Sequence, residues 1–127
     1  SVKSRIFNLT DAISERRISE AIRIVNELIE MKEPVQFIMA MIGRQAGILM
    51  KAKKLEEKRV SQADLAKVLG LHPFVAGKVR KQASAFSTKQ LKRLIRMCYE
   101  TDMAVKTGRM DGRFALELLI IEMGKQV

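Results

Sequence analysis

The stretch from Ser61 to Phe86 constrains the fold most, because it holds two short helices together with the signals that start and stop them. Ser61 predicts a helix N-cap, where its hydroxyl would accept a bond from a free backbone N–H. Gly70 predicts the end of that helix, since glycine readily adopts the left-handed conformation found just past many helices. Pro73 suits the first turn of a second helix, with His72 held extended before it. The stretch is therefore predicted to be a helix, a forced turn and a second helix.

Helical spacing of apolar residues continues on both sides of this stretch. No segment alternates apolar and polar residues with the period of two that a half-buried strand requires, so we expect no sheet. The predicted fold class is all-α, a compact bundle of about seven helices within a single domain. The expected helices cover residues 4–16, 19–31 with Ser19 as N-cap, 34–58, 61–69, 73–85, a segment from Ser87 or Thr88 to Gly108, and one that follows Asp111.

Two helices carry apolar residues on more than one face, and these surfaces are the candidates for contact with another protein. Gly43 and Gly47 lie one turn apart, which predicts a close helix crossing, either within the chain or between subunits. The last helix is apolar nearly all round, with one stripe at Phe114, Leu118 and Ile121, so we expect it to be central. The candidate subunit-interface residues are Gly43, Gly47, Met50, Leu116, Leu119 and Ile120.

Positive charge is concentrated in the middle of the chain. The chain has a net charge of +10, and residues 43–109 contain 16 basic but only 5 acidic side chains. No Asp or Glu lies between Leu65 and Tyr99. Such asymmetry indicates a polyanionic partner, although a solvated basic face that keeps the protein soluble explains it as well. The candidate DNA-contact residues, expected to lack acidic partners, are Lys78, Arg80, Lys81, Lys89, Lys92, Arg93 and Arg96.

The sequence contains no catalytic or metal-binding pattern. His72 is the only histidine, and its place beside Pro73 favours a helix-cap or packing role. Cys98 lies on an apolar seam without a second cysteine nearby, which favours a buried structural thiol. No phosphate-binding glycine loop is present. We therefore expect no enzyme activity of its own, no cofactor, no metal and no bound nucleotide.

The sequence also carries no secretion or membrane signal. A single cysteine excludes a disulfide framework, and no charged leader or long uncharged apolar run occurs. We expect a cytoplasmic protein without membrane contact.

One functional reading of the basic stretch is a helix-turn-helix DNA-binding regulator. The two short helices and the turn between them have the spacing of that motif. Base readout needs polar side chains at the start of the second helix, and Phe74, Val75 and Gly77 supply none. Phosphate contacts by the basic residues stay open under this reading, and they would bind DNA without reading its sequence.

The second reading rests on a resemblance. The runs LGLHPFVAGKVRKQASAFS, LKRLIRMCYETDMAVKTGRMD and ALELLIIEM, preceded by IFNLTDAISERRISEAIRIVNELIEM, resemble the C-terminal domain of the delta subunit family of the bacterial DNA polymerase III clamp loader. The resemblance extends from about Ile6 to Met123. Its most specific parts are the Leu-His-Pro-Phe run and the segment from the aspartate to Lys-Thr-Gly.

The resemblance implies an all-helical collar domain that joins clamp-loader subunits into a ring of five. Its partners would be other loader subunits of the gamma/tau and delta-prime type. The ATPase-like modules of that family precede this domain, so the chain is expected to be a fragment of a longer protein that lacks them, and to open no sliding clamp itself. Joined with the charge asymmetry, the resemblance suggests that the basic face contacts the backbone of primer-template DNA without specificity.

Overall fold

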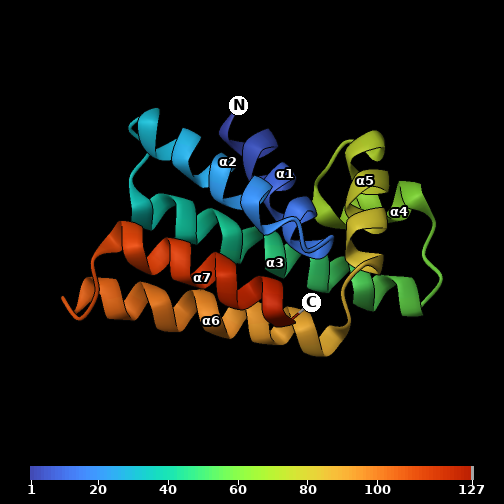
Figure 1. The fold of residues 1–127 in the computed structure, drawn as a ribbon. Coiled ribbons are helices and arrows are strands. Elements are labelled where there is room, and N and C mark those ends of the chain that lie inside the picture. The colour runs from blue at the N-terminus through green and yellow to red at the C-terminus, as the bar shows by residue number, and fades with distance from the viewer. Residues whose placement is uncertain (127) are drawn as a thin grey trace.

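The computed structural model describes residues 1–126, which form seven helices and no strand (Figure 1). This confirms the predicted all-α fold. The helices are α1 (Val2–Ser14), α2 (Ile18–Glu30), α3 (Val35–Glu57), α4 (Gln62–Leu69), α5 (Pro73–Ser84), α6 (Thr88–Lys106) and α7 (Gly112–Gln126).

The long helix α3 is the centre of the bundle, and each of the other six helices packs against it. Helix α6 lies alongside α3, helix α7 packs against α6, α2, α3 and α1, and the short α4–α5 pair sits at the C-terminal end of α3 (Figure 1). The buried residues of α3 occupy more than one side of the helix, as its broad apolar surface predicts. They are Ile38, Met39, Ile42, Ala46, Leu49, Met50 and Ala52.

The expectation that α7 is central was wrong. The buried residues of α7 are Ala115, Leu116, Leu119, Ile120 and Met123, which form one face of the helix. The stripe at Phe114, Leu118 and Ile121, on the opposite face, is 58%, 38% and 41% exposed. Periodicity could not choose between these faces, because both are apolar.

Local capping residues fix several helix ends where the sequence places them. The hydroxyl of Ser61 accepts a 3.1 Å bond from the backbone N–H of Asp64, and Gly70 ends α4 with φ of 67°. Ser87 and Gln90 form a reciprocal capping box at the start of α6. The carboxylate of Asp111 accepts a 3.1 Å bond from Phe114 N. These caps confirm the predicted boundaries of α4, α6 and α7.

The first two helices begin differently from expectation. Helix α1 begins at Val2, where the hydroxyl of Ser1 accepts a 3.3 Å bond from Ser4 N. Helix α2 begins at Ile18, with Arg17 at the N-cap and no side-chain cap, so Ser19 lies inside the helix. Packing of the apolar face of α2 evidently extends the helix past the serine.

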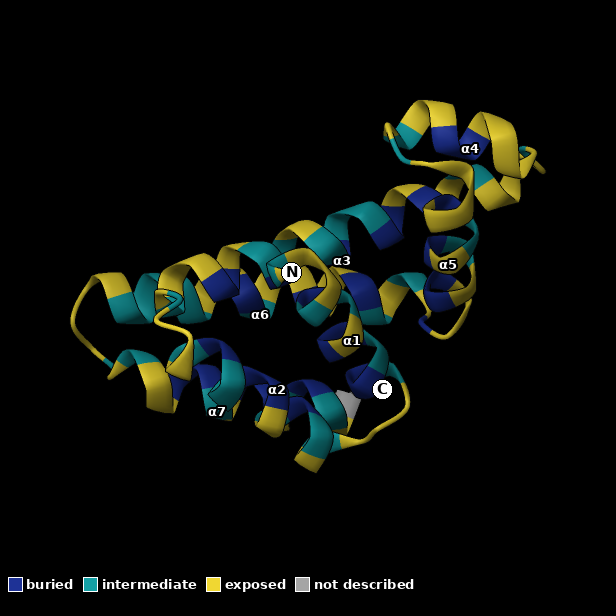
Figure 2. Ribbon diagram, turned by 90° about the horizontal axis from the view of Figure 1, so that it is seen from above, coloured by how far each residue is buried: buried dark blue, intermediate teal, exposed yellow. Residues whose placement is uncertain are grey.

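The α4–α5 pair leaves part of its apolar sequence exposed. Ala76 and Val79 are buried, whereas Phe74 is 67% exposed and Val75 is 39% exposed. Gly77 faces α4, where a Cβ would lie 2.9 Å from the side-chain nitrogen of Gln62. That side chain donates a 2.8 Å bond to the carbonyl of Pro73 and so ties the two helices together. Figure 2 shows how much of the surface of α4 is exposed.

Candidate interaction surfaces

The exposed face of α6 carries four of the seven predicted DNA-contact residues. Lys89, Lys92, Arg93 and Arg96 are all exposed, and they lie opposite the buried residues Leu91, Leu94 and Cys98 of the same helix. Among residues 1–126, no Asp or Glu lies within ion-pair distance of any of the four. We call these four residues the basic face. They form a site of unneutralised positive charge on one helix.

The three candidates on α5 do not extend the basic face as one group. Arg80 was expected to lack an acidic partner, and this was wrong: its Nε lies 2.8 Å from Oε2 of Glu56, and its Nη2 donates a 2.5 Å bond to the carbonyl of Val60. Arg80 thereby joins α5 to the end of α3. The ammonium of Lys78 lies 5.6 Å and 5.4 Å from the ring centres of Phe7 and Phe74.

Lys81, the third candidate on α5, is exposed and lines a small hollow between α3 and α5. Lys53 and Glu56 line the same hollow. Of the seven candidates, the structure therefore gathers only the four on α6 into one surface.

Four of the predicted interface residues lie in the core of the domain. Met50 is 9% exposed, and Leu116, Leu119 and Ile120 are at most 2% exposed. They pack within the chain, so the expectation that they form the surface left for a neighbour was wrong. The apolar residues that α7 does expose are Phe114, Leu118 and Ile121, which we call the α7 stripe.

The two glycines of α3 differ in their surroundings. A Cβ added at Gly43 would lie 3.7 Å from Cβ of Cys98, so at this point α3 makes the close crossing with α6 that the sequence predicts. A Cβ added at Gly47 would meet nothing within 4 Å. The absence of a side chain at Gly47 is therefore not required by any contact within the described chain.

A hollow of about 310 Å³ lies between α3 and α6 next to Gly43. Tyr99 and Ile95 of α6, which are 66% and 36% exposed, line it on one side, and Ala40 of α3 lines it on the other. We call it the α3–α6 hollow.

The polar residues at this hollow are engaged with each other or buried. Asp102 pairs at 2.6 Å with Lys106, which lies one turn later on α6. Burial, with a smaller contribution from the charge of Asp102, raises the pKa of the Cys98 thiol to about 12. The thiol is therefore neutral and structural, as its place on the apolar seam predicts.

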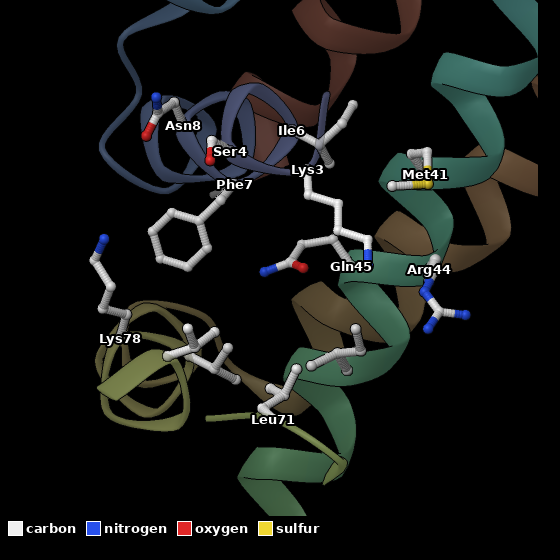
Figure 3. Close-up of a pocket in the computed structure, with 13 residues that line it drawn as sticks. Lys3, Ser4, Ile6, Phe7, Asn8, Met41, Arg44, Gln45, Leu71 and Lys78 are labelled. Carbon is white, nitrogen blue, oxygen red and sulfur yellow. The ribbon is translucent and has the colours of Figure 1, made fainter. Parts of the chain in front are cut away.

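A second hollow, of about 370 Å³, lies between α1, α3 and α5 (Figure 3). Apolar side chains from all three helices and from the turn before α5 line it, and lysines and an arginine stand at its edge. We call it the α1–α3–α5 groove. The sequence alone did not reveal it, because its walls come from three separate segments, within residues 3–8, 41–48 and 71–79, whose meeting no local pattern predicts.

The side chains that could form a catalytic or metal site either bond to other groups or lie apart from one another in the described part of the chain. Nδ1 of His72 accepts a 3.1 Å bond from Phe74 N, which confirms the helix-cap role. Over the part of the chain that the structure describes, no three His, Cys, Asp or Glu side chains are grouped as metal ligands, and no helix is both long and apolar enough to cross a bilayer.

The fold and these surfaces define an all-helical interaction domain. The family model described as the DNA polymerase III delta subunit, C-terminal domain, matches residues 3–123, and the chain belongs to this family. It is 30% identical over 126 residues to DNA polymerase III subunit delta of Bacillus subtilis (strain 168), covering 99% of this chain and 36% of that protein. The chain thus spans about a third of the length of that relative.

A solved structure shows the same fold. The Bacillus subtilis DNA clamp loader delta protein (YqeN) superposes with a TM-score of 0.91 at 30% identity, covering 98% of this chain and 37% of that one. This agreement confirms the resemblance found in the sequence.

Proposed function

We propose that this chain is the assembly, or collar, domain of a clamp-loader delta subunit in bacterial DNA replication. Its partners would be loader subunits of the gamma/tau and delta-prime type, and its place of work the cytoplasm. Membership of the delta C-terminal family supports the proposal. The observation that carries it is the α7 stripe, in which three large apolar side chains at helical spacing are exposed on the surface of the domain.

A member of a ring built from different subunits needs two different contact surfaces, because its two neighbours meet it on different sides. Two of the exposed apolar surfaces of the chain lie on different sides of the α6–α7 pair. One is the α7 stripe, and the other is the α3–α6 hollow with Tyr99 and Ile95. Large aromatic side chains such as Phe114 and Tyr99 are typical anchors of protein interfaces.

A neighbouring subunit would also give a reason for Gly47, which lies one turn beyond the Gly43 that lines the α3–α6 hollow. A glycine inside a helix costs about 1 kcal/mol relative to alanine, and no contact within the described chain requires it. A neighbouring helix that approaches α3 closely at this point would require it. Gly43 and Gly47 therefore stay candidates for the interface, and the two candidate contact surfaces replace Met50, Leu116, Leu119 and Ile120.

Light scattering of mixtures with the candidate loader subunits tests the proposal. Phe114→Glu with Ile121→Glu should abolish or strongly weaken assembly, because charges would be buried at the interface. Val68→Glu on α4 is the matched control, since Val68 is 64% exposed and lies on neither surface. Thermal unfolding of each variant should match the parent chain. Unchanged assembly by the Phe114 and Ile121 variant would remove the α7 stripe from the proposal.

The helix-turn-helix regulator is the less supported alternative. The exposed side chains at the start of α5 are those of Phe74 and Val75, which have no hydrogen-bonding group to read base edges. Such a regulator would enrich a sequence motif when offered random DNA duplexes. We expect no motif to be enriched.

A further inference from the structure

The α1–α3–α5 groove is the largest of the described hollows, and neither candidate assembly surface includes it. Its walls and floor are largely apolar, and the polar residues Ser4, Asn8 and Gln45 also line it. Phe7 comes from α1, Ile48 from α3, Val75 from α5 and Leu71 from the turn before α5. In Figure 3 the ring of Phe7 projects into the space between α1 and α5, with Leu71 across from it.

All the charged residues that line the groove are cations. Lys78 stands at one end, beside Phe7, and Lys3 and Arg44 stand toward the other end (Figure 3). All three are exposed, and no Asp or Glu lines the groove. Over residues 1–126, none of the three takes part in an ion pair. The groove is therefore an apolar trough with unneutralised positive charge at both ends.

We propose that the α1–α3–α5 groove binds a short segment of a partner protein in which one or two large apolar side chains are flanked by carboxylates. The apolar side chains would fill the trough and pack against Phe7, Val75 and Leu71. The carboxylates would meet Lys78 at one end and Lys3 and Arg44 at the other. An aromatic residue in the segment would also stack against Phe7.

A nucleic acid fits the groove less well. Phosphates could meet the three cations, but the sugar-phosphate backbone would leave the apolar trough uncovered. The four-residue basic face on α6 offers phosphates more positive charge. The pairing of apolar floor and cationic ends is therefore better matched by a peptide that combines both characters.

Fluorescence anisotropy with a labelled peptide tests the inference. The probe is fluorescein-Gly-Asp-Glu-Phe-Leu-Glu-Asp-Gly, titrated with the 127-residue chain at low salt. Reversing both ends of the groove with Arg44→Glu and Lys78→Glu should weaken binding at least about tenfold. Lys51→Glu with Lys81→Glu is the matched control, because it makes the same charge change on the same two helices outside the groove. The affinity of this control variant for the peptide should stay within about twofold of that of the parent chain, because the change in net charge alone has only a modest effect on binding.

A second probe separates the apolar from the ionic contribution. Replacing Phe and Leu of the peptide by Ser keeps its charge and should also weaken binding at least about tenfold. Equal binding of both peptides, or equal loss in the groove variant and the control variant, would overturn the proposal. So would a single-stranded oligonucleotide that binds the parent chain and loses affinity in the groove variant alone, since the groove would then be a phosphate site. Matching thermal unfolding of both variants shows that the groove variant is folded.

Discussion

The hydroxyl of Thr10 on α1 donates a 2.8 Å hydrogen bond to the side-chain oxygen of Gln82 on α5, and both side chains are almost fully buried. The same oxygen accepts a 3.1 Å bond from Gln45 of α3, and the amide of Gln82 donates to the carbonyl of Phe7. Gln82 thus joins three helices through polar contacts inside the core. Because buried polar groups are costly when left unpaired, this cluster fixes how α5 sits against α1.

The Gln82 cluster makes the first prediction. Gln82→Leu should lower the free energy of unfolding by about 1 to 2 kcal/mol, since Gln45 loses its partner and the Thr10 hydroxyl keeps only its bonds to the carbonyls of Ile6 and Phe7. In the Gln82→Leu variant, Thr10→Val should lower the free energy of unfolding by less than it does in the parent chain. The expected coupling between the two positions is about 1 kcal/mol. Urea unfolding of the two single variants and the double variant measures this coupling. Strict additivity would show that the Thr10–Gln82 bond contributes nothing.

The sequence predicted helix ends well where a local cap sets them. Ser61, Gly70, Ser87 and Asp111 act within a few residues of themselves, so their types reveal their roles. The orientation of α7 was not predictable, because both of its faces are apolar and only the completed bundle decides which is buried. This one reversal moved the candidate interface from Leu116, Leu119 and Ile120 to the opposite side of the same helix.

Contacts between residues far apart in the sequence could not be predicted from local patterns. Arg80 looks free in the sequence because no acidic residue is near it, yet the fold brings Glu56 within 2.8 Å. Gln82 looks like an ordinary polar helix residue until α1 and α3 close over it. Both depend on long-range packing, which local periodicity does not encode.

Two glycines should respond to alanine in opposite directions. Gly70→Ala should lower the free energy of unfolding by about 1 kcal/mol, because φ of 67° is strained for any residue with a Cβ. Gly47→Ala should raise it by about 0.5 to 1 kcal/mol, because the position is helical and open. Urea unfolding measures both changes.

The same Gly47→Ala variant also tests whether a neighbouring subunit contacts α3 one turn beyond the α3–α6 hollow. If a neighbouring helix packs against Gly47, the variant should be more stable alone and yet assemble more weakly with its loader partners. Sedimentation of mixtures measures the second effect, with Val68→Ala on α4 as an exposed control. A variant that is stabilised and assembles normally would show that no helix approaches α3 at this position.

The buried thiol of Cys98 predicts a dependence of stability on pH. Its pKa is raised from 9.0 to about 12 by burial and by Asp102, so between these values the unfolded chain loses the thiol proton while the folded chain keeps it. Stability should therefore fall as the pH rises above 9, by up to about 1.4 kcal/mol per pH unit from this group. Below pH 9 the thiol contributes no such dependence.

The Cys98→Ala variant isolates this contribution from that of the lysines. The free energy of unfolding of the parent chain minus that of the variant should stay constant below pH 9 and fall as the pH rises above 9. Native chain should also react with a thiol reagent at pH 8 far more slowly than unfolded chain. Rapid labelling of the native chain would show that the thiol is accessible.

The basic face of α6 makes the last prediction. Changing Lys89, Lys92, Arg93 and Arg96 together to Glu should leave the fold intact, because all four side chains are exposed and none is in an ion pair within residues 1–126. If the face contacts primer-template DNA in the assembled loader, the change should weaken DNA binding at every sequence. Up to about four units should then disappear from the slope of log affinity against log salt, roughly one for each phosphate contact.

A matched variant with Glu at Lys32, Lys54, Lys58 and Lys67 changes the net charge equally at exposed positions away from α6. It should lower affinity only slightly and keep the salt slope. Because counterion release follows local phosphate contacts rather than total charge, the difference between the two variants measures what the basic face contributes. Equal slopes in the two variants would mean that the four residues only keep the outer surface of α6 solvated.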